Sequence, residues 1–173
     1  MKITLYIACS LDGYIAAADD DLSFLSAVEQ EGEDYGYQEF TSAIDTVIMG
    51  RKTYDKVLSF GIDFPHKNKK CFVLSNSKSG SDENVTFVRG DVMKLIEMLE
   101  ANGSRNVYCD GGAETVVSLL KQKLINEFVI SVIPVLLGNG VRLFNGSFPE
   151  QHLRLISTKS FSKGLVQLKY EKI

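Results

Sequence analysis

Two junctions between a predicted strand and a predicted helix constrain this chain most. In the first, the apolar run 47–49 ends at Gly50 and a helical pattern follows. In the second, the apolar run 106–109 leads through Asp110 to the pair Gly111-Gly112, and again a helical pattern follows. A helix N-terminus presents unpaired N–H groups and the positive end of the helix dipole, so it attracts phosphate. Two such ends predict a ligand with more than one phosphate, for which a dinucleotide is the first candidate.

The residues at both junctions leave a structural alternative open. After Gly50, Arg51 can grip a phosphate in bidentate fashion, Lys52 acts as a point charge and Thr53 offers a hydroxyl donor. The alternative is an ordinary turn with solvated cations. The Gly111-Gly112 pair is also compatible with a tight turn, although adjacent glycines cost backbone entropy and therefore favour a geometric requirement. The Rossmann G-x-G-x-x-G fingerprint is absent, and residues 138–140 are interpreted as a turn.

Length and composition exclude several classes of protein. The 173 residues fit a single domain, residues 1–173, with a sizeable core, and the net charge of −3 gives no support for binding nucleic acid or an anionic membrane. The three cysteines, Cys9, Cys71 and Cys109, lie in apolar runs and favour buried reduced thiols over disulfides. Only His66 and His152 are histidines, so no metal site is expected. No apolar run reaches membrane-spanning length, and a cytoplasmic location is expected.

Apolar periodicity predicts strands that alternate with helices and end in a hairpin. The predicted strands span residues 3–9, 46–49, 71–74, 85–88, 106–109 and 128–133. Helices are predicted over residues 33–43, after Gly50, after an Asp91 N-cap and after Gly112, whereas residues 16–21 and the basic cluster 65–70 are predicted to be loops. Two further strands, 153–161 and 165–170, form the hairpin. This order predicts an α/β fold with a mostly parallel twisted sheet, helices on both faces and a C-terminal antiparallel hairpin.

These motifs resemble the dihydrofolate reductase superfamily, over essentially the whole chain. Residues 47–54 resemble its M-G-R-x-T segment at the cofactor phosphates, and residues 74–76 resemble a strand end that faces the adenosine 2′-phosphate. Residues 111–114 resemble its Gly-Gly pyrophosphate turn, which in the family usually contains a cis peptide. The segments 10–16 and 134–144 resemble the reductase domain of riboflavin biosynthesis. The resemblance implies a three-layer dihydrofolate reductase-like fold.

The resemblance also implies a function and a set of cofactor residues. It implies an NADPH-dependent reductase of a small heterocyclic or sugar-like substrate, similar to 5-amino-6-(5-phosphoribosylamino)uracil reductase, and a homodimer to which the apolar run 129–137 can contribute. Arg51, Ser75 and Arg89 would face the 2′-phosphate, and Ala8 would line the nicotinamide pocket. The full implied cofactor shell is Ala8, Gly50, Arg51, Lys52, Thr53, Leu74, Ser75, Asn76, Arg89, Gly111, Gly112, Ala113, Glu114 and Thr115.

Departures from both reductase branches keep other functions open. The chain has no tryptophan, which folate reductases carry near the substrate, and it lacks the Cys/His ligands of a zinc deaminase. Tyr14 stands where the riboflavin reductases usually show an arginine. A dihydrofolate or pteridine reductase and a dinucleotide-binding protein without turnover therefore remain alternatives. A purely structural α/β domain would leave both glycine junctions unexplained.

Two carboxylates are candidates for catalysis. After hydride transfer the acceptor gains a proton, and a partly buried carboxylic acid with a raised pKa is one source. Asp34, on the predicted first helix, has the spacing of the folate branch's substrate carboxylate, whereas a solvated helix N-terminus is its alternative. Asp12 follows the first strand, where a ligand of a parallel sheet sits, and its alternative is an Asp-Gly turn. Asp12, Gly13 and Tyr14 are the candidate substrate-binding residues.

Overall fold

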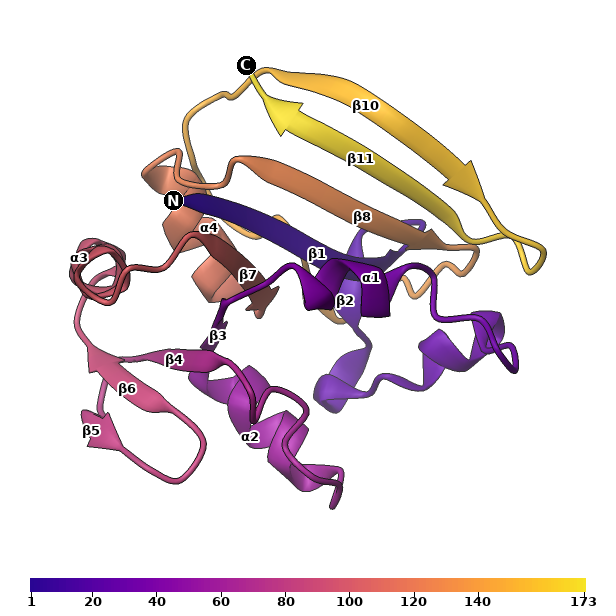
Figure 1. The fold of residues 1–173 in the computed structure, drawn as a ribbon. Coiled ribbons are helices and arrows are strands. Elements are labelled where there is room, and N and C mark those ends of the chain that lie inside the picture. Colours follow the sequence, from indigo (N-terminus) through magenta and orange to yellow (C-terminus); the bar gives the residue numbers. More distant parts are fainter.

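A nine-stranded sheet is the centre of the structure, a computed structural model that describes residues 1–173 (Figure 1). Its strands lie in the order β10-β11-β8-β1-β7-β3-β4-β6-β5, and β2 pairs with β9 in a separate two-stranded sheet. The strands are β1 (Lys2–Ser10), β2 (Tyr14–Ala16), β3 (Thr46–Gly50), β4 (Lys70–Ser75), β5 (Gly80–Ser81), β6 (Thr86–Arg89), β7 (Asn106–Gly111), β8 (Glu127–Ile133), β9 (Val141–Arg142), β10 (Leu153–Ser160) and β11 (Val166–Lys172).

Helices cover both faces of this sheet. They are the 3-10 helices η1 (Ala18–Asp20) and η2 (Ser23–Val28) and the α-helices α1 (Tyr37–Ser42), α2 (Arg51–Ser59), α3 (Val92–Ala101) and α4 (Ala113–Lys121). On one face, α3 and α4 pack Leu95 and Leu119 against β1 residues such as Leu5. On the other, α2 packs Tyr54 against β3 and β4, with Phe40 of α1 beside it. The two cores confirm the predicted α/β layers with a mostly parallel sheet.

Parallel pairing determines where the ends of the central strands meet. Strand β1 pairs in parallel with β7 and β8, β3 pairs in parallel with β7 and β4, and β4 pairs in parallel with β6. The hairpin β10–β11 joins β8 in antiparallel fashion, as predicted. Because parallel strands share one direction, Ser10, Gly50, Ser75 and Gly111 all end at the same edge of the sheet. In open α/β sheets this carboxyl edge is where ligands bind.

The predicted helix over residues 33–43 is wrong in its first part. Helix α1 begins only at Tyr37, because Tyr35 (φ 58°) and Gly36 (φ 83°) adopt left-handed backbone conformations that a helix cannot continue. The Asp34 carboxylate accepts hydrogen bonds from the N–H groups of Gly36 (2.9 Å) and Gln38 (2.8 Å). Asp34 therefore lies before the helix and closes its first turn, rather than lying on it.

The basic cluster 65–70 is mostly an exposed turn, as its charge predicts, and the exceptions are buried His66 and half-buried Lys69. His66 is only 3% exposed, and its ring packs edge-on against Phe64 and Tyr108. The Lys69 ammonium donates to the carbonyls of Thr41 and Ile44, which lie at and just beyond the end of α1. The segment is held by these long-range contacts, which local composition does not reveal. Within residues 16–21, which were expected to be a loop, the structure contains the end of β2 and the short helix η1. It also contains η2, which was not predicted.

The apolar run 129–137 is partly buried within the sheet. Its first part forms β8, which lies between β1 and β11 and buries Val129 and Ile133. The end of the run is open, where Leu136 is 71% exposed. The exposed edge of the sheet is instead β10, whose residues are all exposed. Within β8, Ile130 and Val132 are half-buried, and the expectation that this run contributes to an interface stays a prediction.

All three cysteines are buried and free, as the composition predicts. Burial raises the pKa of the Cys71 thiol, and likewise that of Cys109, to about 12. Thiols are poor nucleophiles while they remain protonated. These residues therefore behave as small apolar side chains of the core. None of the helices has both the length and the apolar character needed to cross a membrane.

Replacement of Leu5 by alanine tests the assignment of the core. Leu5 on the central strand β1 has no exposed surface, so Leu5→Ala is expected to lower the free energy of unfolding by about 2–5 kcal/mol, through lost burial and the cavity left behind. Urea denaturation followed by circular dichroism measures the change. Leu136→Ala, at a residue that is 71% exposed, is the control and is expected to change stability by less than about 0.5 kcal/mol. Equal losses in both variants would contradict this core.

Candidate functional site

The two glycine junctions are in direct contact at the carboxyl edge of the sheet. Strands β3 and β7 are neighbours, and Met49 pairs with Gly111. A Cβ atom on Gly50 would lie 2.8 Å from Thr115 Oγ1, and one on Gly112 would lie 3.0 Å from Thr53 Oγ1. The N-cap glycine of each helix therefore packs against a threonine in the first turn of the other helix. This contact places the N-termini of α2 and α4 side by side, where they can share one anionic ligand.

The Gly111-Gly112 pair has the geometry that the resemblance implies. The peptide bond between the two residues is cis. Gly111 has φ +111°, a region that side-chain-bearing residues rarely adopt. Ala113 and Thr115 are buried in the first turn of α4, whereas Glu114 is exposed. The Glu114 carboxylate lies 3.9 Å from the Lys52 ammonium, so the two exposed charges face each other across the junction.

Cations gather beyond the junction, around the ring of Phe87. The Arg51 guanidinium lies 5.5 Å and the Lys78 ammonium 4.8 Å from the centre of that ring. Arg51 also pairs with Asp55, one turn later, through Nε at 2.7 Å. Its terminal nitrogens make no hydrogen bond to the protein and remain available to a ligand. Sequence reasoning missed Lys78, because only the fold of the segment after β4 brings it to the same ring as Arg51.

The end of β4 also contributes to this cationic region. Ser75 is buried, and its hydroxyl oxygen accepts hydrogen bonds from the N–H groups of Ser77 (3.3 Å) and Lys78 (3.0 Å). Only its O–H therefore remains to donate to a ligand. Arg89 is the exposed partner of Ser75 on the neighbouring strand β6. Leu74, which is half-buried, precedes Ser75 and exposed Asn76 follows it. Because Leu74 pairs with Gly50, which precedes Arg51, residues 74–76, Arg89 and Arg51 belong to neighbouring strand ends of the sheet.

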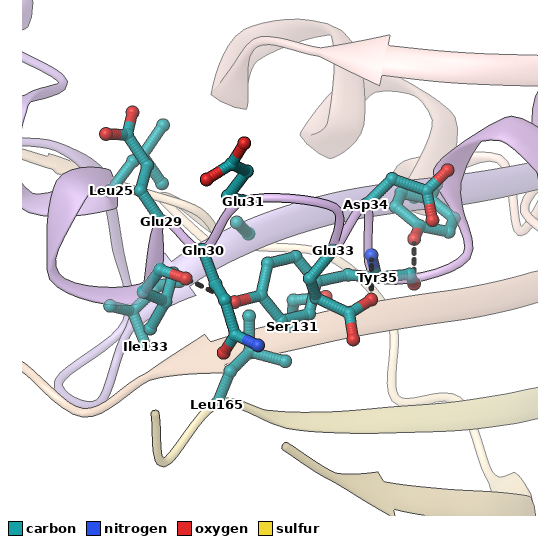
Figure 2. Close-up of a pocket in the computed structure, with 13 residues that line it drawn as sticks. Leu25, Glu29, Gln30, Glu31, Glu33, Asp34, Tyr35, Ser131, Ile133 and Leu165 are labelled. Atoms are coloured by element: carbon teal, nitrogen blue, oxygen red, sulfur yellow. Dashed lines mark hydrogen bonds between the residues drawn. The ribbon is translucent and has the colours of Figure 1, made fainter. Parts of the chain in front are cut away.

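A pocket of about 440 Å³ opens at the other end of the same edge (Figure 2). It lies over one face of the carboxyl-terminal halves of β1 and β8, and the segment that runs from η2 to α1 covers it. Its thirteen lining residues are Tyr6, Ala8, Leu25, Val28, Glu29, Gln30, Glu31, Glu33, Asp34, Tyr35, Ser131, Ile133 and Leu165. Two predicted site residues, Ala8 and Asp34, therefore meet here although they come from distant parts of the chain.

A hydrogen-bond network fixes the polar side of this pocket. The amide Nε2 of Gln167, on β11, lies 3.1 Å from the Tyr6 hydroxyl, the Ser131 hydroxyl and the Tyr35 carbonyl. The Tyr6 hydroxyl donates to the Tyr35 carbonyl at 2.9 Å. Burial raises the pKa of Tyr6, so its hydroxyl stays protonated at neutral pH. Sequence reasoning missed Gln167, which belongs to the C-terminal hairpin and reaches the pocket only through the pairing of β11 with β8.

Asp34 lies at the pocket as an ionised carboxylate. The hydrogen bonds from the N–H groups of Gln38 and Gly36 lower its pKa below the ordinary value. This contradicts the expectation of a carboxylic acid with a raised pKa, because two backbone donors stabilise the charged form. Asp34 is suited to accept hydrogen bonds from a ligand rather than to supply a proton.

Asp12 joins two loops and does not line the pocket. Its carboxylate accepts hydrogen bonds from the Ser10 hydroxyl (2.6 Å) and from the N–H groups of Leu137 (3.1 Å) and Gly138 (2.7 Å). The bond from Ser10 and those from the backbone lower the pKa of Asp12 to about 2. The lowered pKa disfavours the protonated form that a proton donor needs, for the same physical reason as at Asp34.

The other two candidate substrate residues also serve the loop contact. Gly13 donates its N–H to the Ser10 carbonyl and has φ +85°, as a tight turn requires. The Tyr14 ring is buried beneath the Arg142 guanidinium, 4.6 Å from the ring centre, and its hydroxyl donates to the Gly138 carbonyl. Neither residue is among those that line the pocket. The structure thus brings residues 12–14 to the 137–142 loop instead.

Asp110, beside the Gly-Gly pair, turns toward the aromatic core. Its carboxylate accepts a hydrogen bond of 2.5 Å from the Tyr108 hydroxyl and lies 3.5 Å from His66 Nε2. Burial, and next the charge of Asp110, raises the pKa of Tyr37 to about 12. These neighbours hold the Asp110 carboxylate on the face of the sheet that α1 and α2 cover. A pyrophosphate bound at the Gly-Gly turn would repel this carboxylate if it pointed toward the ligand.

Comparison with known proteins identifies relatives over the whole length. A family model described as RibD C-terminal domain matches residues 1–167. The uncharacterized protein YwjB of Bacillus subtilis (strain 168) is 43% identical over 170 residues, which cover 98% of this chain and 97% of that protein. The uncharacterized protein YyaP of the same organism is 27% identical over 183 residues, which cover 98% of this chain and 94% of that protein.

Solved structures share the fold. A putative riboflavin biosynthesis protein from Shewanella sp. PV-4 has a TM-score of 0.92 and 36% identity, and the match covers 100% of this chain and 99% of that chain. A Thermotoga maritima protein described as a diaminohydroxyphosphoribosylaminopyrimidine deaminase/5-amino-6-(5-phosphoribosylamino)uracil reductase has a TM-score of 0.75 and 16% identity. That match covers 99% of this chain and 56% of the other, and at such low identity it shows the fold alone.

The contact between the two junctions leads to a prediction about Gly50. A methyl group there would meet Thr115 Oγ1, so Gly50→Ala is expected to lower the free energy of unfolding by about 1–3 kcal/mol. Thr115→Ala removes the clashing oxygen, and the double variant is expected to lose less than the sum of the two single variants. Urea denaturation of all four proteins gives the coupling. Additive losses would show that Gly50 and Thr115 do not touch.

The lowered pKa of Asp12 leads to a prediction about pH. A carboxyl whose pKa falls from about 3.9 in the unfolded chain to about 2 in the fold stabilises the protein fully above the higher value and loses that contribution as pH falls toward the lower one. The stability difference between the wild type and Asp12→Asn is therefore expected to be constant at neutral pH and to shrink as pH falls from about 4 to about 2. Urea denaturation across this range measures it. A difference that grows on acidification would contradict the hydrogen bonding.

Proposed function

This chain belongs to the RibD C-terminal domain family, and on that premise we propose that it is an NADPH-dependent reductase of a small heterocyclic or sugar-like substrate. The observation that carries the proposal is the order of features along the carboxyl edge. Cations at the end of β4 are followed by the paired helix N-termini at β3 and β7, and then by the pocket at β1 and β8. This order matches the parts of the cofactor and its substrate.

The residues present fit a dinucleotide. Neighbouring strands lie about 4.8 Å apart, so the three steps from β4 to β1 span about 14 Å, a length suited to an extended dinucleotide. Gly50 and Gly112 let the two helix N-termini approach closely, because a Cβ atom at either position would press on a threonine of the other helix, and both N-termini carry unpaired N–H groups. Arg51, Lys78 and Arg89 supply the cations that a 2′-phosphate requires. Ala8 is small and half-buried, so a ring can lie against β1.

The roles of the protein in the reaction follow from this arrangement. The bound cofactor supplies the hydride, and the chain positions the two reactants. The apolar residues of the pocket, such as Leu25, Val28 and Ile133, exclude water around the reacting carbon. Asp34 accepts hydrogen bonds from the substrate and orients it, while Gln167 holds the Tyr6 and Ser131 hydroxyls in fixed positions.

A second candidate function is dinucleotide binding without turnover. One observation favours it: neither Asp12 nor Asp34 has the raised pKa of a proton donor. The two candidates differ in whether NADPH is consumed. We also propose a cytoplasmic location and a homodimer, for which the exposed edge strand β10 offers a surface with Leu155 51% and Ile156 45% exposed.

Cofactor binding tests the proposal directly. A ligand that binds only the folded protein raises its melting temperature, so NADPH is expected to stabilise the protein more than NADH does. Arg51→Ala removes a charged contact to the 2′-phosphate. It is expected to lower the affinity for NADPH by about tenfold or more and to leave the affinity for NADH nearly unchanged. Titration of both cofactors with both proteins, followed by fluorescence, provides the affinities.

Lys52→Ala is the matched control. It removes a cation that is assigned to the pyrophosphate, which both cofactors share. The affinities for NADPH and NADH are therefore expected to fall by the same factor. Equal losses in Arg51→Ala would refute the 2′-phosphate role, and a protein that binds neither cofactor would refute the proposed function. NADPH that binds but is not oxidised in the presence of pterin, flavin-precursor or quinone-like acceptors would favour the non-catalytic candidate.

A further inference from the structure

We infer that the pocket takes a neutral or cationic nitrogen heterocycle and rejects a phosphorylated one. This inference rests on the proposed function, because it identifies the pocket as the substrate end of the reductase site. The substrate inferred for this chain therefore differs from that of the Thermotoga maritima protein, whose description refers to a phosphoribosyl compound.

The charges that line the pocket are all negative. Among its thirteen residues are four carboxylates, Glu29, Glu31, Glu33 and Asp34, and no lysine or arginine. All four come from the single segment that covers the pocket (Figure 2). Like charges repel, and exposed carboxylates near the mouth of a pocket act on a charged ligand in a manner that weakens as salt is added. A ligand with a phosphate dianion therefore meets an unfavourable potential as it enters.

The carboxylates are not neutralised by the protein. Glu33 accepts a hydrogen bond from the Tyr35 N–H at 2.8 Å, which fixes its position but leaves its charge. Glu29 and Glu31 are exposed and their carboxylates form no ion pair. Lys163 reaches this segment, but its ammonium donates to the backbone carbonyl of Glu29 rather than to a carboxylate. The segment thus keeps its negative charge beside the pocket.

The groups that usually hold a phosphate are absent from the pocket or already occupied. Helix α1 begins beside it, but the Gln38 N–H in the first turn of that helix already donates to the Asp34 carboxylate. The cations Arg51 and Lys78 lie at the other end of the edge, around Phe87. Phosphate recognition in proteins relies on such N–H groups and on arginine or lysine. Positive and negative side chains therefore lie in different parts of the site. The cations lie toward the cofactor end, and the carboxylates lie toward the substrate end.

The rest of the pocket suits a flat ring. Its apolar lining includes Leu25, Val28 and Leu165, and Tyr6 and Tyr35 supply aromatic surface. A volume of about 440 Å³ accommodates a heterocycle of one or two rings. Asp34, ionised at the rim, can accept hydrogen bonds from ring N–H or amino groups. These features together identify the substrate class by its chemistry.

Matched pairs of ligands test the inference. Uridine and cytidine are compared with their 5′-monophosphates, and pterin is added as a ring without a sugar, each by thermal shift and calorimetry with and without saturating NADPH. At least one of the unphosphorylated compounds is expected to bind. Each 5′-monophosphate is expected to bind at least about tenfold more weakly than the unphosphorylated compound that binds most tightly. Monophosphates that bind as well as or better than the parent compounds overturn the inference, and so does a panel in which no unphosphorylated compound binds.

The double variant Glu29→Gln/Glu31→Gln identifies the cause. Both side chains are exposed and unpaired, so the fold is expected to remain intact. The ratio of the dissociation constant of a monophosphate to that of its parent compound is expected to fall by about threefold to tenfold. Glu97→Gln/Glu100→Gln, which removes the same charge from exposed positions on α3, is the control and is expected to leave the discrimination unchanged. An unchanged ratio in the first variant overturns the charge argument.

The two proposals fail in different ways. A chain that binds no NADPH refutes the proposed reductase, yet the ligand pairs measured without cofactor still report the charge preference of the pocket. A chain that binds NADPH and favours the monophosphates keeps the reductase and refutes the substrate class. Both double variants are expected to retain NADPH binding, because the substituted residues are not among the residues assigned to the cofactor.

Discussion

The contact between the two glycine junctions is the constraint on which the candidate site depends. Gly50 packs against Thr115 and Gly112 against Thr53, at distances where a Cβ atom at either glycine would force the threonine to shift. This reciprocal packing brings the N-termini of α2 and α4 to one point of the sheet edge. Neither helix alone would provide more than a weak anion site, but together they present N–H groups from two directions. The cations around Phe87 and the pocket beside Ala8 acquire a common ligand only because this contact lies between them.

The carboxyl edge also carries a separation of charge. Arg51, Lys78 and Arg89 lie at one end, and the carboxylates of residues 29–34 lie at the other. The distance between the two groups is fixed by the sheet, since β4 and β1 are separated by β3 and β7. Such an arrangement can orient a dinucleotide, because its phosphates are attracted to one end and repelled from the other. The same separation makes the pocket selective toward the charge of whatever lies next to the cofactor.

Local chemistry predicted the parts of the fold that depend on neighbours in the sequence. The strands, the hairpin and the Asp91 N-cap followed from periodicity and capping, and Asp91 does accept the Lys94 N–H at 3.0 Å. Predictions failed where distant contacts override local preference. The helix expected from residue 33 starts later because Tyr35 and Gly36 turn left-handed, and His66 is buried although it stands in a basic cluster. The pKa values expected for Asp12 and Asp34 had the wrong sign, because backbone donors that fold against them cannot be read from composition.

The sequence by itself determined the two strand–glycine–helix junctions and the alternation of strands with helices, because both follow from patterns within a few residues. It therefore indicated an anion-binding edge and the family resemblance that went with it. Only the tertiary structure decided which residues share a site. It placed residues 12–14 against the 137–142 loop, brought Lys78 and Gln167 to the site, and placed the acidic segment 29–34 over strands β1 and β8. The physical reason is that strand order and loop packing place side chains from distant segments together, and no local pattern encodes that order.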